Sequence, residues 1–148
     1  MERKIVPDVI NGQSIHKVAP SDTVLSAARM MRERKIAAVV VMESDRLVGI
    51  ITERDMTTRV IAAGLNPDTT LARDIMTANP DTLGPDDKAS YAIQMMREHN
   101  YRHLPVVEGH KVVGMVSVRD LYAVYNTELE QDLKDRNAFI FGENYGTA

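Results

Sequence analysis

Two short stretches of the chain carry residue types that could bind a charged ligand. The first reads Gly49-Ile50-Ile51-Thr52-Glu53-Arg54-Asp55, and the second, 65 residues later, reads Gly114-Met115-Val116-Ser117-Val118-Arg119-Asp120. In each stretch an apolar strand pattern follows a glycine and ends at a hydroxyl residue, and an arginine–aspartate pair comes next, where a helical pattern begins. Such a junction gathers a hydroxyl, unpaired backbone N–H groups, a guanidinium and a carboxylate, which together suit a phosphate and a ribose.

The same residues also have a purely structural interpretation. Thr52 to Asp55 and Ser117 to Asp120 fit Ser/Thr-x-x-Asp, a variant of the helix capping box in which the carboxylate also favours the positive end of the helix dipole. Capping by itself does not require Arg54 or its counterpart Arg119, which on this interpretation are solvated surface charges. The two interpretations are compatible, because a capping box can hold a carboxylate in position for a ligand.

The composition narrows the possible functions. The 148 residues are 44% hydrophobic and 26% charged, which predicts one compact domain with its own core. The net charge of −3 argues against broad binding of nucleic acid, which needs a basic surface. There is no cysteine, and His16, His99 and His110 are scattered without a spacing such as His-x-x-x-His among them, so we predict no disulfide and no metal site. We see no signal peptide and no apolar run long enough for a membrane span, so we expect a cytoplasmic protein.

An internal duplication organises the chain. Residues 18–56 and 83–121 align without a gap and share thirteen of thirty-nine positions. Each copy predicts a helix that begins near a proline, at Pro20-Ser21-Asp22 or Pro85-Asp86-Asp87, with Ser21 or Asp22 as the cap in the first copy. A strand hairpin and a second helix follow, and one strand leads into each copy.

The predicted fold is therefore α/β of the α+β type, with two tandem β-α-β-β-α repeats related by a pseudo-twofold axis. We divide the chain into a first repeat with the N-terminal segment and linker at residues 1–76, a second repeat at 77–125, and a helical extension and tail at 126–148. Neither half has enough surface to bury a core by itself, so the two repeats should form one domain.

The duplicated Gly-x-x-Thr/Ser-x-x-Asp motif, preceded by Ala-Val-Val-Val or His-Leu-Pro-Val-Val, resembles the cystathionine β-synthase (CBS) domain family. The resemblance covers roughly residues 5–125, and two such repeats form a Bateman module, which here would be a stand-alone one. It implies clefts between the repeats that bind AMP, ADP, ATP, NAD(H) or S-adenosylmethionine, and it also implies a homodimer.

The resemblance also implies a set of ligand-binding residues. Asp55 and Asp120 would hold the riboses, Thr52 and Ser117 would line the ribose–phosphate region, and Arg54 and Arg119 would contact phosphates. The remaining contacts of the two clefts would come from the strands and hairpins: Lys17, Val18, Ala37 and Ala38 for one, and Thr77, Thr82, Arg102, His103, Leu104 and Pro105 for the other.

Three classes of function remain open at this point. The first is a regulatory module that binds an adenine nucleotide and signals through its conformation or dimer geometry to an effector protein that is not known. The second is an enzyme, which we do not expect, because no nucleophile–base pair, metal cluster or P-loop is visible. The third is a structural or protein-interaction module without a ligand. The C-terminal helix and the Phe139-Ile140-Phe141 segment are candidates for contact with a partner.

Overall fold

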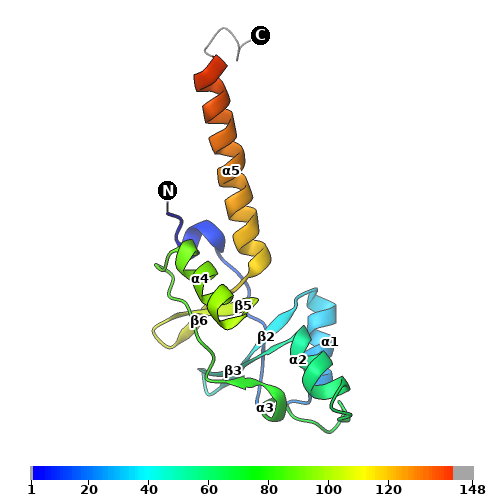
Figure 1. Cartoon of the computed structure of the whole chain (residues 1–148). Coiled ribbons are helices and arrows are strands. Elements are labelled where there is room, and N and C mark those ends of the chain that lie inside the picture. Colours follow the sequence, from blue (N-terminus) through cyan, green and yellow to red (C-terminus); the bar gives the residue numbers. More distant parts are fainter. Residues whose placement is uncertain (1, 142–148) are drawn as a thin grey trace.

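The computed structural model describes residues 2–141, and the side chains as far as residue 138. Two repeats lie side by side, and a long helix extends from the second (Figure 1). The elements, in chain order, are η1 (Ile5–Val9), β1 (Lys17–Val18), α1 (Val24–Arg34), β2 (Ala38–Glu43), β3 (Arg46–Thr52), α2 (Glu53–Asp55), η2 (Met56–Ile61), α3 (Ala72–Ile75), β4 (Thr77–Ala78), α4 (Ala89–His99), β5 (His103–Glu108), β6 (Lys111–Ser117) and α5 (Val118–Phe141).

The strand pairing confirms the predicted β-α-β-β-α order of each repeat. β2 and β3 form an antiparallel hairpin, and β5 and β6 form its counterpart in the second repeat. A parallel strand leads into each hairpin: Val18 of β1 pairs with Val41, and Leu83 pairs with Val106 at the equivalent positions. The fold is mixed α/β, as the sequence predicts.

The starts of the two first helices differ from the sequence prediction. Helix α1 begins at Val24, and its N-cap is Thr23, whose hydroxyl accepts from the Ser26 N–H at 3.2 Å. The predicted cap Asp22 instead accepts from the backbone N–H of Ala19 at 2.7 Å. Asp87 does the same for Gly84, also at 2.7 Å. Each aspartate therefore closes the turn before the helix, and the N-cap position falls to the next residue, Thr23 or Lys88, of which only Thr23 makes a side-chain capping hydrogen bond.

Each repeat has its own hydrophobic core, built at equivalent positions, which corrects the prediction that neither half could bury a core by itself. Val24, Ala27 and Met31 of α1 pack on the first hairpin, and Ala89, Ala92 and Met96 of α4 pack on the second. The helical spacing of Val24, Ala27, Ala28 and Met31 in the sequence predicts a buried face; Ala28 is only half-buried, and the other three are buried.

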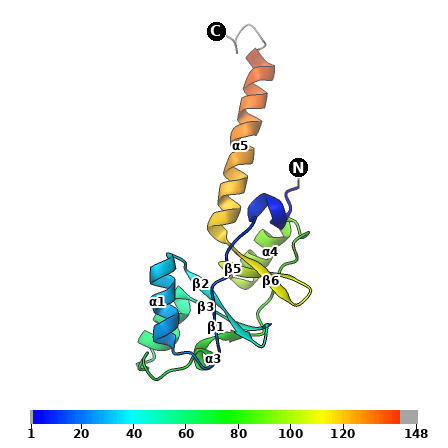
Figure 2. The same cartoon turned by 180° about the vertical axis from the view of Figure 1, so that it is seen from behind.

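The short segments that precede the two repeats are exchanged between them. η1 precedes the first repeat but packs on the second: the Ile5 N–H donates to the Asp87 carbonyl at 2.8 Å, and Ile5 and Ile10 lie in the second core. Conversely, α3 precedes the second repeat but packs on the first, where the Ala72 N–H donates to the Asp22 carbonyl at 2.7 Å. Figures 1 and 2 both show the N-terminal helical turn beside α4 and the start of α5.

Two glycines make room for these exchanged segments. A Cβ on Gly49 would overlap the side chain of Met76, which follows α3, and a Cβ on Gly114 would overlap Ile10, which follows η1. The duplicated glycine of the motif therefore allows close approach of the segment that closes each repeat. The predicted boundaries at residues 76 and 125 stay a prediction, but the N-terminal segment packs on the second repeat.

Helix α5 runs well beyond the body of the molecule (Figures 1 and 2). Leu121 is buried, whereas Tyr122, Leu129 and Leu133 are exposed. An ion pair between Arg3 Nε and Glu128 Oε1, at 2.9 Å, joins the helix to the N-terminal segment. Residues 139–141 continue the helical backbone, but the predicted contact through Phe139-Ile140-Phe141 falls on side chains outside the described part.

Candidate functional site

The first motif lies where β3 passes into α2, and it forms a complete capping box. The Asp55 N–H donates to Thr52 Oγ1 at 3.3 Å, and the Thr52 N–H donates to Asp55 Oδ2 at 2.8 Å. The Thr52 hydroxyl also lies 3.1 Å from the same carboxylate oxygen. These contacts fix the carboxylate of Asp55, which is only 9% exposed.

The second motif repeats this geometry where β6 passes into α5. The Asp120 N–H donates to Ser117 Oγ at 3.1 Å, and the Ser117 N–H donates to Asp120 Oδ2 at 2.8 Å. The capping interpretation is therefore confirmed for both copies. It leaves one oxygen of each carboxylate outside the box.

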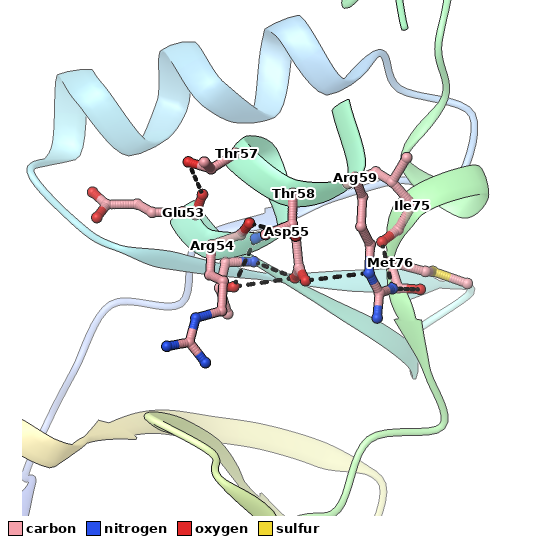
Figure 3. A network of polar contacts seen from close by, with 9 residues as sticks. Glu53, Arg54, Asp55, Thr57, Thr58, Arg59, Ile75 and Met76 are labelled. Carbon is pink, nitrogen blue, oxygen red and sulfur yellow. Dashed lines mark hydrogen bonds and ion pairs between the residues drawn. The ribbon is translucent and has the colours of Figure 1, made fainter. Parts of the chain in front are cut away.

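The remaining oxygen differs between the two motifs. Asp55 Oδ1 lies 3.6 Å from Arg59 Nε, and Arg59 Nη1 donates to the carbonyls of Ile75 at 2.9 Å and Met76 at 3.3 Å (Figure 3). The position equivalent to Arg59 in the second repeat is Val124, which cannot form such a pair. Figure 3 also shows the Arg54 guanidinium directed away from this network.

Both motifs open onto one large cleft between the repeats, with a volume of about 1380 Å³. Twelve of the sixteen residues predicted for the ligand line it: Ala37, Ala38, Thr52, Arg54, Asp55, Thr77, Arg102, His103, Leu104, Ser117, Arg119 and Asp120. The fold therefore brings together residues from two stretches that are 65 positions apart in the chain.

The other four predicted residues lie outside this cleft. Val18 is buried in the first core, and Pro105 is fully buried in β5, so both contribute to packing. Lys17 and Thr82 are exposed and do not line the cleft. Side chains of neighbouring strand residues point to opposite faces of the strand. Leu104 therefore reaches the cleft, whereas its neighbour Pro105 does not.

Several lining residues were not predicted. Gln13 and Ser14 reach the cleft from the segment before β1, and Lys35 and Asn100 reach it from the ends of α1 and α4. Lys35 and Asn100 occupy equivalent positions, and both have the left-handed backbone that ends a helix, with φ of 55° and 59°. The equal 65-residue spacing is the signal that could have found this last pair.

His103 is the most unusual titratable group of the cleft. Its Nδ1 is buried and has no hydrogen-bond partner among the described residues. Burial lowers the pKa of His103, Asp120 and Glu53 act against this shift, and the charge of Arg102 adds to it. The residue at the equivalent position of the first repeat is Ala38, which does not titrate. Near His103 in the chain, the Tyr101 hydroxyl donates to Asp81 Oδ2 at 2.6 Å, and this hydrogen bond raises the pKa of Tyr101.

The charges of the two motif arginines face the cleft. Within the described residues, the guanidinium of neither Arg54 nor Arg119 takes part in an ion pair. No group of three or more His, Asp or Glu side chains in that part of the chain could hold a metal ion. Across residues 2–141, no helix has the length and apolar character needed to cross a bilayer.

Comparison with protein families matches the model described as "CBS domain" twice, at residues 6–62 and 72–126. The chain belongs to the CBS-domain family. Its two tandem CBS domains form a CBS pair, or Bateman module, and they account, with α5, for nearly all the described residues. No catalytic domain lies within that part of the chain.

Related CBS proteins are known from several organisms. The chain is 38% identical over 119 residues to protein MK0525 of Methanopyrus kandleri, covering 79% of this chain and 58% of that protein. It is 36% identical over 126 residues to the mitochondrial CBS-domain protein CBSX3 of Arabidopsis thaliana, covering 82% of this chain and 61% of the relative. The chain thus spans about three fifths of these two relatives.

Solved structures share the CBS-pair fold. A CBS-domain protein from Burkholderia ambifaria, provisionally described as acting in signal transduction, superposes with a TM-score of 0.77 at 31% identity, over 81% of this chain and 91% of the other. The CBS-domain protein NE2398 superposes with a TM-score of 0.78 at 27% identity, over 83% and 97% of the two chains.

Proposed function

We propose that this CBS pair is a regulatory module that binds an adenosine-containing nucleotide, AMP, ADP, ATP, NAD(H) or S-adenosylmethionine, in the cleft between its repeats. The observation that supports this most is the position of two capped carboxylates on one cleft, each with an arginine next to it in the chain. A carboxylate oxygen outside a capping box can accept hydrogen bonds from the two hydroxyls of a ribose, and a guanidinium can pair with phosphate.

The size and charge of the cleft are consistent with this ligand class. A volume of about 1380 Å³ exceeds the roughly 300–1,000 Å³ of typical small-molecule sites, so the cleft has room for more than one nucleotide. Arg54, Arg102 and Arg119 supply positive charge at its surface. The signal would be a change in the relation of the two repeats, or of a homodimer, in proportion to the ligand's preference for one arrangement.

An interaction module without a ligand is the second candidate, and two observations favour it. Capping alone accounts for the positions of Asp55 and Asp120. Tyr122, Leu129 and Leu133 are exposed on a helix that extends from the body, as a protein contact surface would be.

Calorimetric titration separates the two candidates. The purified protein, after mass spectrometry for any nucleotide carried over from expression, is titrated with AMP, ADP, ATP, NAD⁺, NADH and S-adenosylmethionine. Micromolar binding of one of them, at one or two per chain, would support the nucleotide function. No binding and no carried-over nucleotide would favour the interaction module.

Asp120→Ala provides the matching test of the site. We expect it to weaken nucleotide binding by about 10- to 150-fold, the size of hydrogen bonds to a charged group. Asp68→Ala removes the same charge from an exposed loop and should leave the affinity unchanged. Since Asp120 also caps α5, circular dichroism must first show that the variant is folded. Unchanged affinity in folded Asp120→Ala would refute the assignment of this carboxylate.

A further inference from the structure

The carboxylates of Asp55 and Asp120 have the same kind of hydrogen-bond partner at Oδ2 but differ in what lies near Oδ1. In both, Oδ2 accepts the backbone N–H of the capping residue at 2.8 Å. Asp55 Oδ1 is paired with Arg59 Nε at 3.6 Å, whereas Asp120 Oδ1 has no hydrogen bond or ion pair among the residues that the structure describes. A diol would need Oδ1 as a hydrogen-bond acceptor. In the first motif this oxygen is shared with Arg59, and in the second it is available.

Arg59 connects the first motif to the segment that leads into the second repeat. Its Nη1 donates to the carbonyls of Ile75 and Met76, at the end of α3. The next residues form β4, which pairs with β3 and continues toward the second repeat, and Thr77 lines the cleft. One guanidinium therefore joins the Asp55 carboxylate, the end of α3 and the start of the connection (Figure 3).

We propose that Arg59 is a positioning residue that makes the two motifs bind in order. This inference rests on the proposed nucleotide function. A ribose diol binds Asp120 first. Binding at Asp55 then requires Arg59 to release Oδ1, and this movement loosens its hold on residues 75 and 76. Occupancy of the first motif is in this way coupled to the connection between the repeats.

The physical basis is competition for one oxygen. A vicinal diol donates two hydrogen bonds, and a carboxylate oxygen that already faces a cation offers fewer open lone-pair directions. The Arg59 side chain is 48% exposed, so its pair with Asp55 is weak and can be displaced by a ligand. The expected difference between the motifs is correspondingly small, roughly 2- to 5-fold in affinity from this pair alone.

The chain itself supplies the matched variant, since Val124 stands at the equivalent position. The variant Arg59→Val gives the first motif the residue that the second motif has at this position. The variant Arg59→Lys keeps the charge but loses the planar guanidinium, which reaches both the carboxylate and the carbonyls. Nuclear magnetic resonance with AMP as the probe follows the backbone amides of residues 52–55 and 117–120 separately in each protein.

In the unaltered protein we expect the amides of 117–120 to shift at lower AMP concentration than those of 52–55. In Arg59→Val the first motif should bind AMP about 2- to 5-fold more tightly, and the two curves should approach each other. Equal affinities in the unaltered protein, or weaker binding at 52–55 in Arg59→Val, would overturn the proposal.

Hydrogen exchange without ligand tests the connection independently. The Met76 N–H bonds to Ala72 and the Asn79 N–H bonds to Val48, and both should exchange several-fold faster in Arg59→Val. The Ile10 N–H, bonded to Ile5 in the equivalent segment, is the internal control and should not change. Unchanged exchange at 76 and 79 would refute the link through Arg59.

The two arms also separate this inference from the proposed function. If AMP shifts neither motif in any variant while exchange at 76 and 79 rises, the link is supported, but AMP binding and its ordered occupancy of the two motifs are both refuted. If AMP binds with the same affinity to both motifs, the nucleotide function stands and Arg59 has no part in ordering it.

Discussion

The two repeats use one scaffold to present different surroundings to the same motif. Both have the capping box, the glycine beside the closing segment and a helix ended by a left-handed residue. They differ at the side chains around the carboxylate. Arg59 of the first repeat is replaced by Val124 in the second, and Ala38 of the first repeat is replaced by His103. The features that stabilise the fold are the same in both halves, whereas the side chains that a ligand would contact differ.

This comparison shows how a duplicated site can come to do two things. The same capping box holds both carboxylates at the cleft, while the side chains at neighbouring positions differ between the repeats. The first motif is tied to the connection by a guanidinium, and the second lies beside a half-buried imidazole. Experiments that treat the halves as a matched pair can therefore separate structural from ligand effects.

The largest effects should come from the two cores, which test whether the repeats are equal in stability. Ile5 and Ile51 are fully buried, one in each core, and Ile→Ala at either should lower the free energy of unfolding by about 2–5 kcal/mol. Urea denaturation followed by circular dichroism measures this. Ile61→Ala, at a position 75% exposed, is the control and should stay within about 0.5 kcal/mol. A similarly small effect at Ile5 would show that η1 does not belong to the second core.

The next effect concerns the glycines that admit the closing segments. Gly49→Ala and Gly114→Ala should each cost about 1–3 kcal/mol by overpacking. The cost should be smaller at Gly114, where only the terminal methyl of Ile10 and Gln13 Oε1 are close, than at Gly49, where the overlap extends along Met76 to its Cβ at 3.1 Å. Thermal unfolding measures both, and Gly49→Ala with Met76→Ala completes a double-mutant cycle. Additive effects in that cycle would contradict the proposed contact.

The smallest effect is the pH dependence that His103 adds to the second repeat alone. Burial lowers the pKa of His103 in the folded protein below its ordinary value of 6.5, so the unfolded chain takes up the proton first as the pH falls. Its contribution to stability is complete above pH 6.5 and is lost as the pH falls toward the folded pKa.

Denaturation between pH 7 and 5 measures this contribution. His103→Ala, which copies the first repeat, should lose stability less steeply below pH 6.5 than the unaltered protein does. His110→Ala, in the exposed turn between β5 and β6, is the control. The same steepness in His103→Ala and the unaltered protein would show that another group titrates.

Sequence reasoning succeeded where the information is local. The capping boxes, the hairpins and the helical face of Val24, Ala27 and Met31 all follow from short spacings in the chain. The duplication predicted two clefts, one for each motif, whereas in the structure both motifs line one cleft. The pair of Asp55 with Arg59 is also local, four residues apart on one helical turn, and it could have been predicted.

The failures are those that depend on packing. Thr23 caps α1 because Asp22 is already used in the preceding turn, which the composition of the stretch does not reveal. Val18 lies in the first core and Pro105 is buried within β5, and neither lines the cleft, because their register is set by partner strands. The exchange of η1 and α3 joins residues far apart in the chain, and no local pattern carries that information.

The exchanged segments also order the events of synthesis. At about 5–20 residues per second, roughly 4–16 seconds separate the addition of Ile5 from that of Asp87, to which it bonds. The first repeat receives its closing segment, α3, soon after its second helix, so it can assemble while the chain is still growing. Ile5 and Ile10 must remain without their partners until the second hairpin has emerged. During synthesis the apolar residues of this segment are therefore buried later than those of the first repeat that follow them in the chain.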